Sequence, residues 1–74
     1  MAQKVIFAKV FKDGEIKKEE KICNTEDEMM KCFDECVESF EEFCKEFGTF
    51  ERYKYLSASG EALGIACAVM VENI

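Results

Sequence analysis

The sequence predicts one α+β domain over residues 1–74, of ββαββ type, in which a four-stranded mixed sheet packs on one long amphipathic helix. The chain has 74 residues, of which 49% are hydrophobic, and this suits a single domain with a single core. One stretch with helical periodicity, residues 25–48, lies between two segments that carry the apolar runs and turn signals of β-hairpins.

The first hairpin is predicted before residue 24. Gln3 to Phe11 is rich in β-forming residues, Asp13-Gly14 is a strong two-residue turn signal, and Ile16 to Cys23 returns as an antiparallel strand. The returning strand contains five consecutive charged residues, and charged side chains protect an exposed sheet edge. We therefore expect this second strand at an edge of the sheet.

The predicted helix has a signal at each end. Thr25 followed by Glu28 forms a capping box, in which two side chains satisfy backbone donors at the helix start. Gly48, directly after Phe47, is the residue type that commonly ends a helix in the left-handed conformation. These signals predict one helix of roughly 22 residues, about 33 Å long.

This helix has an apolar and an acidic side. Its apolar residues fall within an arc of roughly 160°, which we expect to face the sheet. They are Met29, Met30, Cys32, Phe33, Cys36, Val37, Phe40, Phe43, Cys44 and Phe47. Residues 24–47 contain nine acids and two lysines, a net charge of about −7, whereas the whole chain carries −6. The negative charge is therefore concentrated on the helix.

The second hairpin follows the helix. Thr49 to Ser57 is predicted as the third strand and Ser57 to Gly60 as a turn. The last strand, Ala62 to Val71, contains no charged residue and is expected in the middle of the sheet. With the first and last strands central, the strand order is 2-1-4-3, the central pair is parallel, and the helix crosses behind the sheet.

This order of elements resembles the β-grasp arrangement of ubiquitin and of the immunoglobulin-binding domain of protein G. The likeness covers nearly the whole chain and implies the mixed sheet described above. The resemblance assigns no functional residue to this chain, since Glu72-Asn73-Ile74 differs from the Gly-Gly tail of conjugating ubiquitin-like proteins. A ferredoxin-like fold or another open ββαββ sandwich is the alternative.

Composition also limits where the chain acts. It lacks a stretch of about 18 apolar residues and the residue order of a signal peptide, so we expect a cytoplasmic protein. The five cysteines are an odd number within apolar periodicity, which predicts free thiols. A charge of −6 disfavours direct binding to nucleic acid or to an anionic membrane and favours a partner with a basic surface.

Residues suited to catalysis or metal binding are scarce. The chain has no histidine and no glycine-rich phosphate loop, and Ser57 and Ser59 have no partner base. Cys32 and Cys36 are one helical turn apart, as two zinc ligands can be, but cysteines among phenylalanines more often pack as small hydrophobic residues. We predict a protein that is not an enzyme and binds no cofactor or metal.

The acidic side of the helix is the first candidate site. Its predicted partner-binding residues are Asp34, Glu35, Glu38, Glu41, Glu42 and Glu46. They suit an inhibitor or adaptor that binds a basic protein surface, for example on a nucleic-acid-handling enzyme, in the style of DNA-mimic inhibitors and of the small viral anti-CRISPR proteins of phages. The alternative is that this charge only keeps a small protein soluble.

The sheet face away from the helix is the second candidate. The last strand is apolar on both faces, and one helix covers only one of them. Because a charged residue, Lys9, lies mid-strand, we expect its face of the first strand to be open. The predicted dimer or ligand face is Phe7, Lys9, Phe11, Tyr53 and Tyr55. It suits a homodimer that encloses a small ligand; a structural subunit that adds an edge strand to a neighbour is a further alternative.

Overall fold

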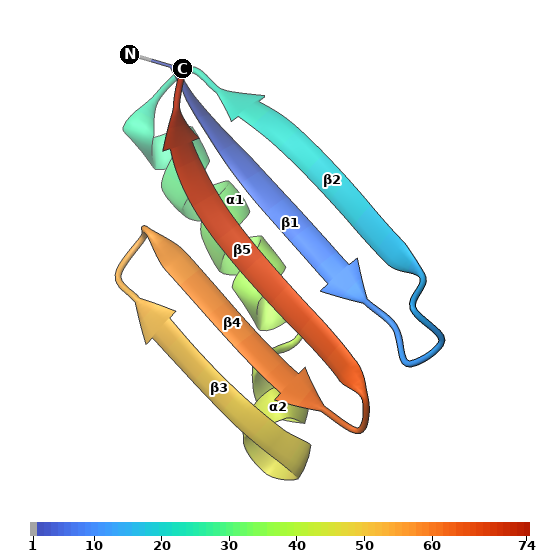
Figure 1. Cartoon of the computed structure of the whole chain (residues 1–74). Coiled ribbons are helices and arrows are strands. Elements are labelled where there is room, and N and C mark those ends of the chain that lie inside the picture. The colour runs from blue at the N-terminus through green and yellow to red at the C-terminus, as the bar shows by residue number, and fades with distance from the viewer. Residues whose placement is uncertain (1) are drawn as a thin grey trace.

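The computed structural model describes residues 2–74 as two layers, a twisted sheet with helices on one face (Figure 1). The elements lie in the order β1 (Gln3–Val10), β2 (Ile16–Cys23), α1 (Glu26–Glu38), α2 (Glu41–Phe47), β3 (Gly48–Tyr53), β4 (Ser57–Ala62) and β5 (Ile65–Asn73). Among these residues, no helix is both long enough and apolar enough to cross a lipid bilayer.

The sheet has five strands in the order β2-β1-β5-β4-β3, and every neighbouring pair is antiparallel. The α+β class is confirmed, as are the edge position of β2 and the central position of the last strand. The four-stranded mixed sheet was wrong. One additional strand reverses the direction of the last strand, so the parallel central pair of the β-grasp arrangement is replaced by an antiparallel pair, β1 and β5.

The additional strand is β4, which occupies the segment predicted as a turn. The chain turns earlier, at residues 54–56, where Lys54 has a φ of 50° and the Leu56 N–H donates to the Tyr53 carbonyl over 3.0 Å. The small residues of β4 do not form a turn; they allow another element to pack closely against this strand. A Cβ atom on Gly60 would lie 2.8 Å from the Cys44 Sγ atom, so the close approach of α2 requires glycine there.

The first hairpin forms where the sequence predicts it. β1 and β2 pair from Gln3 with Cys23 to Val10 with Ile16. The connection is longer than a two-residue turn, because residues 11–15 lie outside both strands. Gly14, with a φ of 93°, donates its N–H to the Phe11 carbonyl over 2.9 Å.

The predicted helical segment of about 22 residues forms, but it is bent, and Ser39 and Phe40 separate α1 from α2. The Thr25 cap is confirmed, since its hydroxyl accepts the Glu28 N–H over 3.1 Å. α1 ends where the Ser39 hydroxyl donates to the Cys36 carbonyl over 2.6 Å, and helices commonly bend where such a side chain binds the backbone. The next residue, Phe40, is only 3% exposed, so the bend lets the helical segment follow the sheet while this ring enters the core.

Gly48 follows α2 for a reason other than the predicted one. Its φ of −166° is extended, not left-handed, and it is already the first residue of β3. A Cβ atom at this position would overlap the Glu61 carbonyl oxygen and would lie 2.8 Å from the Ala62 Cα atom. Glycine is therefore required because β3 passes close to the backbone of β4.

The core lies between the helices and one face of the sheet. It is formed by Val5, Cys23, Met29, Phe33, Val37, Phe40, Cys44, Ala58, Ala62, Cys67 and Val69. The predicted apolar arc was too wide, because Phe43 and Phe47 are 40% and 51% exposed. α2 packs on β3 and β4 through Cys44, which leaves these two rings at the surface, tilted against each other with their centres 5.3 Å apart.

All five cysteines are free thiols, as predicted. Burial raises the pKa of Cys23, Cys44 and Cys67. Burial and the neighbouring Cys32 raise the pKa of Cys36 from its ordinary value of 9.0 to about 11. The folded domain therefore holds these thiol protons more tightly than the unfolded chain does.

This difference predicts a loss of stability in alkali. The contribution of a thiol with a raised pKa is complete below the unfolded pKa, and it is lost as pH rises from about 9 to about 11. We expect the melting temperature to fall between about pH 8 and about pH 10.5 more steeply in the wild type than in Cys36→Ala. Thermal unfolding followed by circular dichroism with a reductant present measures this, and equal slopes would contradict it.

Candidate functional site

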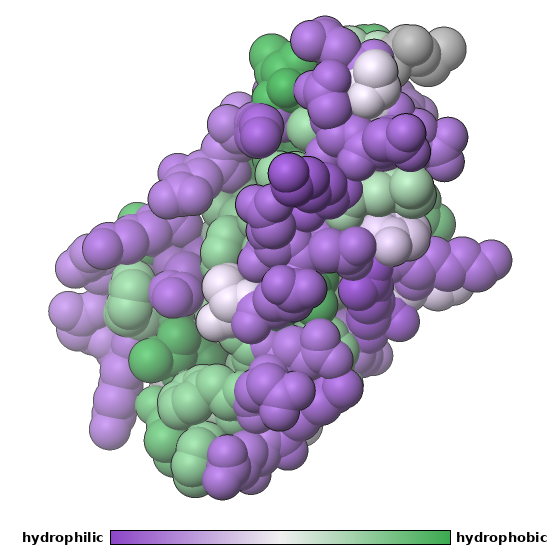
Figure 2. Space-filling model, turned by 180° about the vertical axis from the view of Figure 1, so that it is seen from behind, coloured by the Kyte–Doolittle hydropathy of each residue, from purple (hydrophilic) through white to green (hydrophobic). Residues whose placement is uncertain are grey.

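Carboxylates cover the outer side of the two helices. Figure 2 shows the molecule from this side, and most of the surface there is hydrophilic. Glu35 and Glu38 come from α1, and Glu42 and Glu46 from α2; all four are exposed. Within residues 2–74, none of these four takes part in an ion pair. We call these four residues the acidic ridge.

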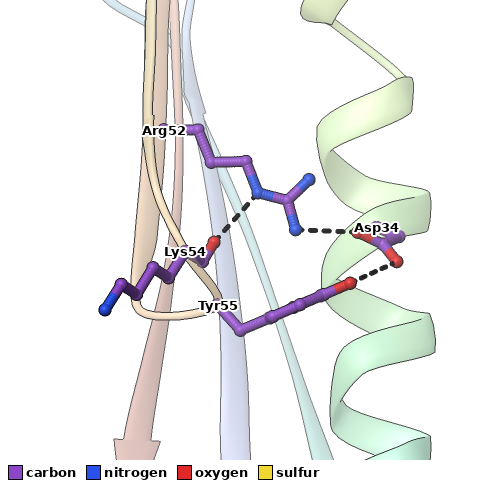
Figure 3. Close-up of polar contacts among 4 residues, drawn as sticks. All are labelled: Asp34, Arg52, Lys54 and Tyr55. Atoms are coloured by element: carbon purple, nitrogen blue, oxygen red, sulfur yellow. Dashed lines mark hydrogen bonds and ion pairs between the residues drawn. The ribbon is translucent and has the colours of Figure 1, made fainter.

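Asp34, also predicted to bind a partner, is instead engaged within the domain (Figure 3). Arg52 of β3 donates from Nη2 to the Asp34 Oδ1 atom over 2.8 Å, and the Tyr55 hydroxyl donates to Oδ2 over 3.2 Å. Both carboxylate oxygens are therefore occupied. This cluster ties α1 to the edge strand β3 and to the turn that follows it.

Arg52 is held on several sides. Its guanidinium lies 5.0 Å from the ring centre of Phe33 and 4.7 Å from that of Tyr55, and its Nε atom donates to the Lys54 carbonyl over 2.9 Å. Burial by itself would lower the pKa of Arg52, but the hydrogen bond and charge of Asp34 outweigh it and leave the pKa raised. The arrangement is a structural tie in which each charge already has a partner within the domain.

Glu41 is likewise engaged, by Lys45 one turn further along α2. The Lys45 Nζ atom donates to the Glu41 Oε2 atom over 2.6 Å, and this hydrogen bond and the Glu41 charge raise the pKa of Lys45. The same ammonium lies 5.4 Å from the ring centre of Phe50. Of the six carboxylates predicted to bind a partner, four thus take part in no ion pair among residues 2–74.

The ridge crosses the bend between the helices. Sequence periodicity treats Glu38 and Glu42 as neighbours four residues apart on one straight helix, but Ser39 and Phe40 interrupt the helix between them. No glycine or proline marks this break in the sequence. The geometry of the ridge therefore depends on how Phe40 is held in the core.

The second predicted site, the dimer or ligand face, does not gather on the open side of the sheet. Phe7 points to the helices, where its ring lies 5.9 Å from that of Phe40, and Tyr55 packs at 5.7 Å from Phe33. Lys9 and Phe11 share the face of Phe7, and the Lys9 ammonium lies 5.7 Å from the Phe11 ring centre. Of the five residues, only Tyr53 lies on the open face.

The open face was assigned wrongly because Lys9 is charged and was therefore expected to point away from the helices. The helices do not reach the end of β1, so a charged residue there can point to the helical side and stay partly exposed beside the Phe11 ring. The open face instead carries the alternate residues of the strands. The large apolar ones among them are Ile6, Val10, Ile16, Ile22, Tyr53 and Met70.

The thiols of α1 border a shallow cleft beside β2. Cys32 and Cys36 line it together with Glu19, Glu35 and other residues, and its volume is about 310 Å³. In the described part of the chain, no group of three or more histidine, cysteine or acidic side chains is arranged to hold a metal ion. The raised pKa of Cys36 also keeps its thiol protonated, which does not favour nucleophilic chemistry.

Comparisons of this chain with protein-family models, with curated protein sequences and with solved structures find no match.

Proposed function

We propose that the chain is a non-enzymatic protein-interaction module, an inhibitor or adaptor, that binds a basic surface of a partner protein through the acidic ridge. The observation that supports this is the acidic ridge itself: its four carboxylates are exposed on the outer side of the helices, and none of them is in an ion pair among residues 2–74. Elsewhere on the helices, Asp34 and Glu41 are each held by a cation.

The ridge carries an energetic cost within the domain. Glu42 and Glu46 lie one turn apart on α2 and repel each other, and such a like-charge pair destabilises a helix by a few tenths of a kcal/mol. Glu46 also lies near the negative end of the α2 dipole. A partner that supplies lysines or arginines would turn this repulsion into attraction.

A nucleic-acid-handling enzyme is the partner class that fits best. Its binding groove is lined by basic residues spaced to neutralise phosphates, and an acidic ridge on a narrow helical layer can occupy such a groove. Attraction between opposite surfaces mainly speeds association and weakens with added salt. The proposed complex should therefore be strongly salt dependent.

The test reverses the charge in the middle of the ridge. A Glu38→Lys, Glu42→Lys double variant should lose partners that the wild type captures from lysate at low salt, and should bind an identified partner about tenfold or more weakly. The measurements are affinity capture with identification of the bound proteins, followed by titration with the purified partner. The captured partner should have a basic surface.

A Glu15→Lys, Glu72→Lys double variant is the matched control. It changes the net charge by the same amount at two exposed carboxylates outside the helices. This control should keep the partner. If both double variants lost it equally, net charge alone would explain capture, and if neither did, the acidic ridge would not be the binding site.

A further inference from the structure

The open face of the sheet has two halves that differ in charge. The strand registers align side chains into rows across the sheet. One row contains Lys18, Ala8, Ala68, Ser59 and Glu51, and the next contains Ile16, Val10, Ala66, Glu61 and Thr49. The central strand β5 divides each row into a β2–β1 half and a β4–β3 half.

The β2–β1 half is positive. Lys4 and Lys18 both bind the Glu20 carboxylate, at 3.3 Å and 3.2 Å, which leaves one net positive charge. The β4–β3 half is negative, because Glu51 and Glu61 are exposed and, among the described residues, neither is in an ion pair. The two halves are therefore complementary in charge.

The two halves also differ in shape. On the β2–β1 half, Ile16 protrudes, with 66% of its surface exposed. A shallow hollow of about 630 Å³ lies mainly over β5, β4 and β3, where small side chains such as Ala66, Ala68 and Ser59 form much of the lining, and it is bordered on the β1 side by Ala8 and Val10. The projecting Ile16 thus lies on one half, and most of the hollow lies on the other.

We propose that a second copy of this chain covers the open face, related by a two-fold axis that runs between the two β5 strands and parallel to them. This operation places β2 over the partner's β3 and β1 over the partner's β4. Lys18 then faces the partner's Glu51, and Ile16 faces the partner's Thr49, which lines the hollow. A two-fold axis perpendicular to the strands would instead place each half over the same half of the partner, so that like charges would face each other.

The size of the face suits this occupant. The domain measures 37 × 22 × 15 Å, and the sheet spans the two larger dimensions. A face of these dimensions offers roughly 800 Å², about the area that each partner buries in a stable interface. Two sheets that pack about 10 Å apart also leave the helices and the acidic ridge on the outside, so this dimer does not depend on the proposed function.

Sedimentation velocity over a concentration series tests the dimer and its axis. The wild type should sediment as a dimer. Lys18→Glu and Glu51→Lys should each weaken dimerisation by roughly tenfold, because each places like charges together at two symmetric positions. The variant that carries both exchanges should recover wild-type affinity, since the pair is restored with its signs reversed.

Two further variants complete the test. Ala68→Glu places two carboxylates together at the axis and should yield a monomer whose circular dichroism matches the wild type. Glu38→Lys, on the outer side of α1, should leave dimerisation unchanged. A wild type that stays monomeric at millimolar concentration, or an exchanged pair that does not recover affinity, would overturn the proposal.

Discussion

Replacing Gly48 by alanine is expected to destabilise the domain by about 3 kcal/mol or more, a large part of the stability of a chain this short. The added Cβ atom would overlap the carbonyl oxygen of Glu61 and would lie 2.8 Å from the Ala62 Cα atom. Both contacts are with the backbone of β4, so no side-chain rotation can relieve them. Chemical denaturation followed by circular dichroism measures the loss.

Gly14→Ala is the matched control for this substitution. Gly14 has a φ of 93°, but no atom lies within 4 Å of the position that its Cβ would take. The control should therefore cost only the conformational strain of a left-handed alanine, about 1–2 kcal/mol. If Gly14→Ala proved the more damaging of the two, the close approach of β3 and β4 would not be what requires glycine at residue 48.

Replacing Phe40 by alanine is expected to cost about 3–5 kcal/mol, because this ring is buried and the space that it leaves cannot easily close. Phe40 is 3% exposed, and its ring lies 5.9 Å from that of Phe7 and 5.8 Å from that of Phe50. It therefore joins β1, the helix bend and β3. For a domain of this length, the loss lowers the melting temperature by more than about 12 °C.

Phe43→Ala removes the same side chain one turn away and serves as the control. Phe43 is 40% exposed, and among the aromatic rings of residues 2–74 it contacts only that of Phe47. Its loss should cost much less, about 1 kcal/mol or below. Equal effects of the two substitutions would mean that the ring at the bend has no special part in the core.

The two proposed surfaces lie on opposite sides of the domain and use different forces. The acidic ridge is charged throughout and should bind with strong salt dependence. The open sheet face is apolar in its middle and charged towards both edges, which suits a lasting contact between copies. A dimer through the sheet would present two acidic ridges pointing away from each other, and linked sites of this kind bind a repeated or dimeric partner more tightly than one site does.

Local signals predicted the parts of this fold that depend on neighbouring residues. The Thr25 cap involves the N–H of Glu28, three residues away. The run of charges in β2 and the uncharged run in β5 each indicated a place in the sheet that the structure confirms. Such signals work because capping, charge and side-chain alternation act within a few residues along the chain.

The placement of the candidate-site side chains was predicted in part. The exposed carboxylates of the acidic ridge follow from helical periodicity alone. That Asp34 is occupied does not, because its partners Arg52 and Tyr55 lie 18 and 21 residues further along the chain. The face of the sheet that stays open was also assigned wrongly, since Lys9 is charged and yet lies on the helical side, beyond the reach of the helices.

The amino-acid sequence by itself determined the class of this domain, its first hairpin, its two-sided helical segment, its edge and central strands and its reduced thiols. Tertiary structure decided the fifth strand, the direction of β5, the bend at Phe40 and the exposure of Phe43 and Phe47. Each of these depends on contacts between distant segments, such as Cys44 against Gly60, because the space that a side chain finds across the core is set by another part of the chain.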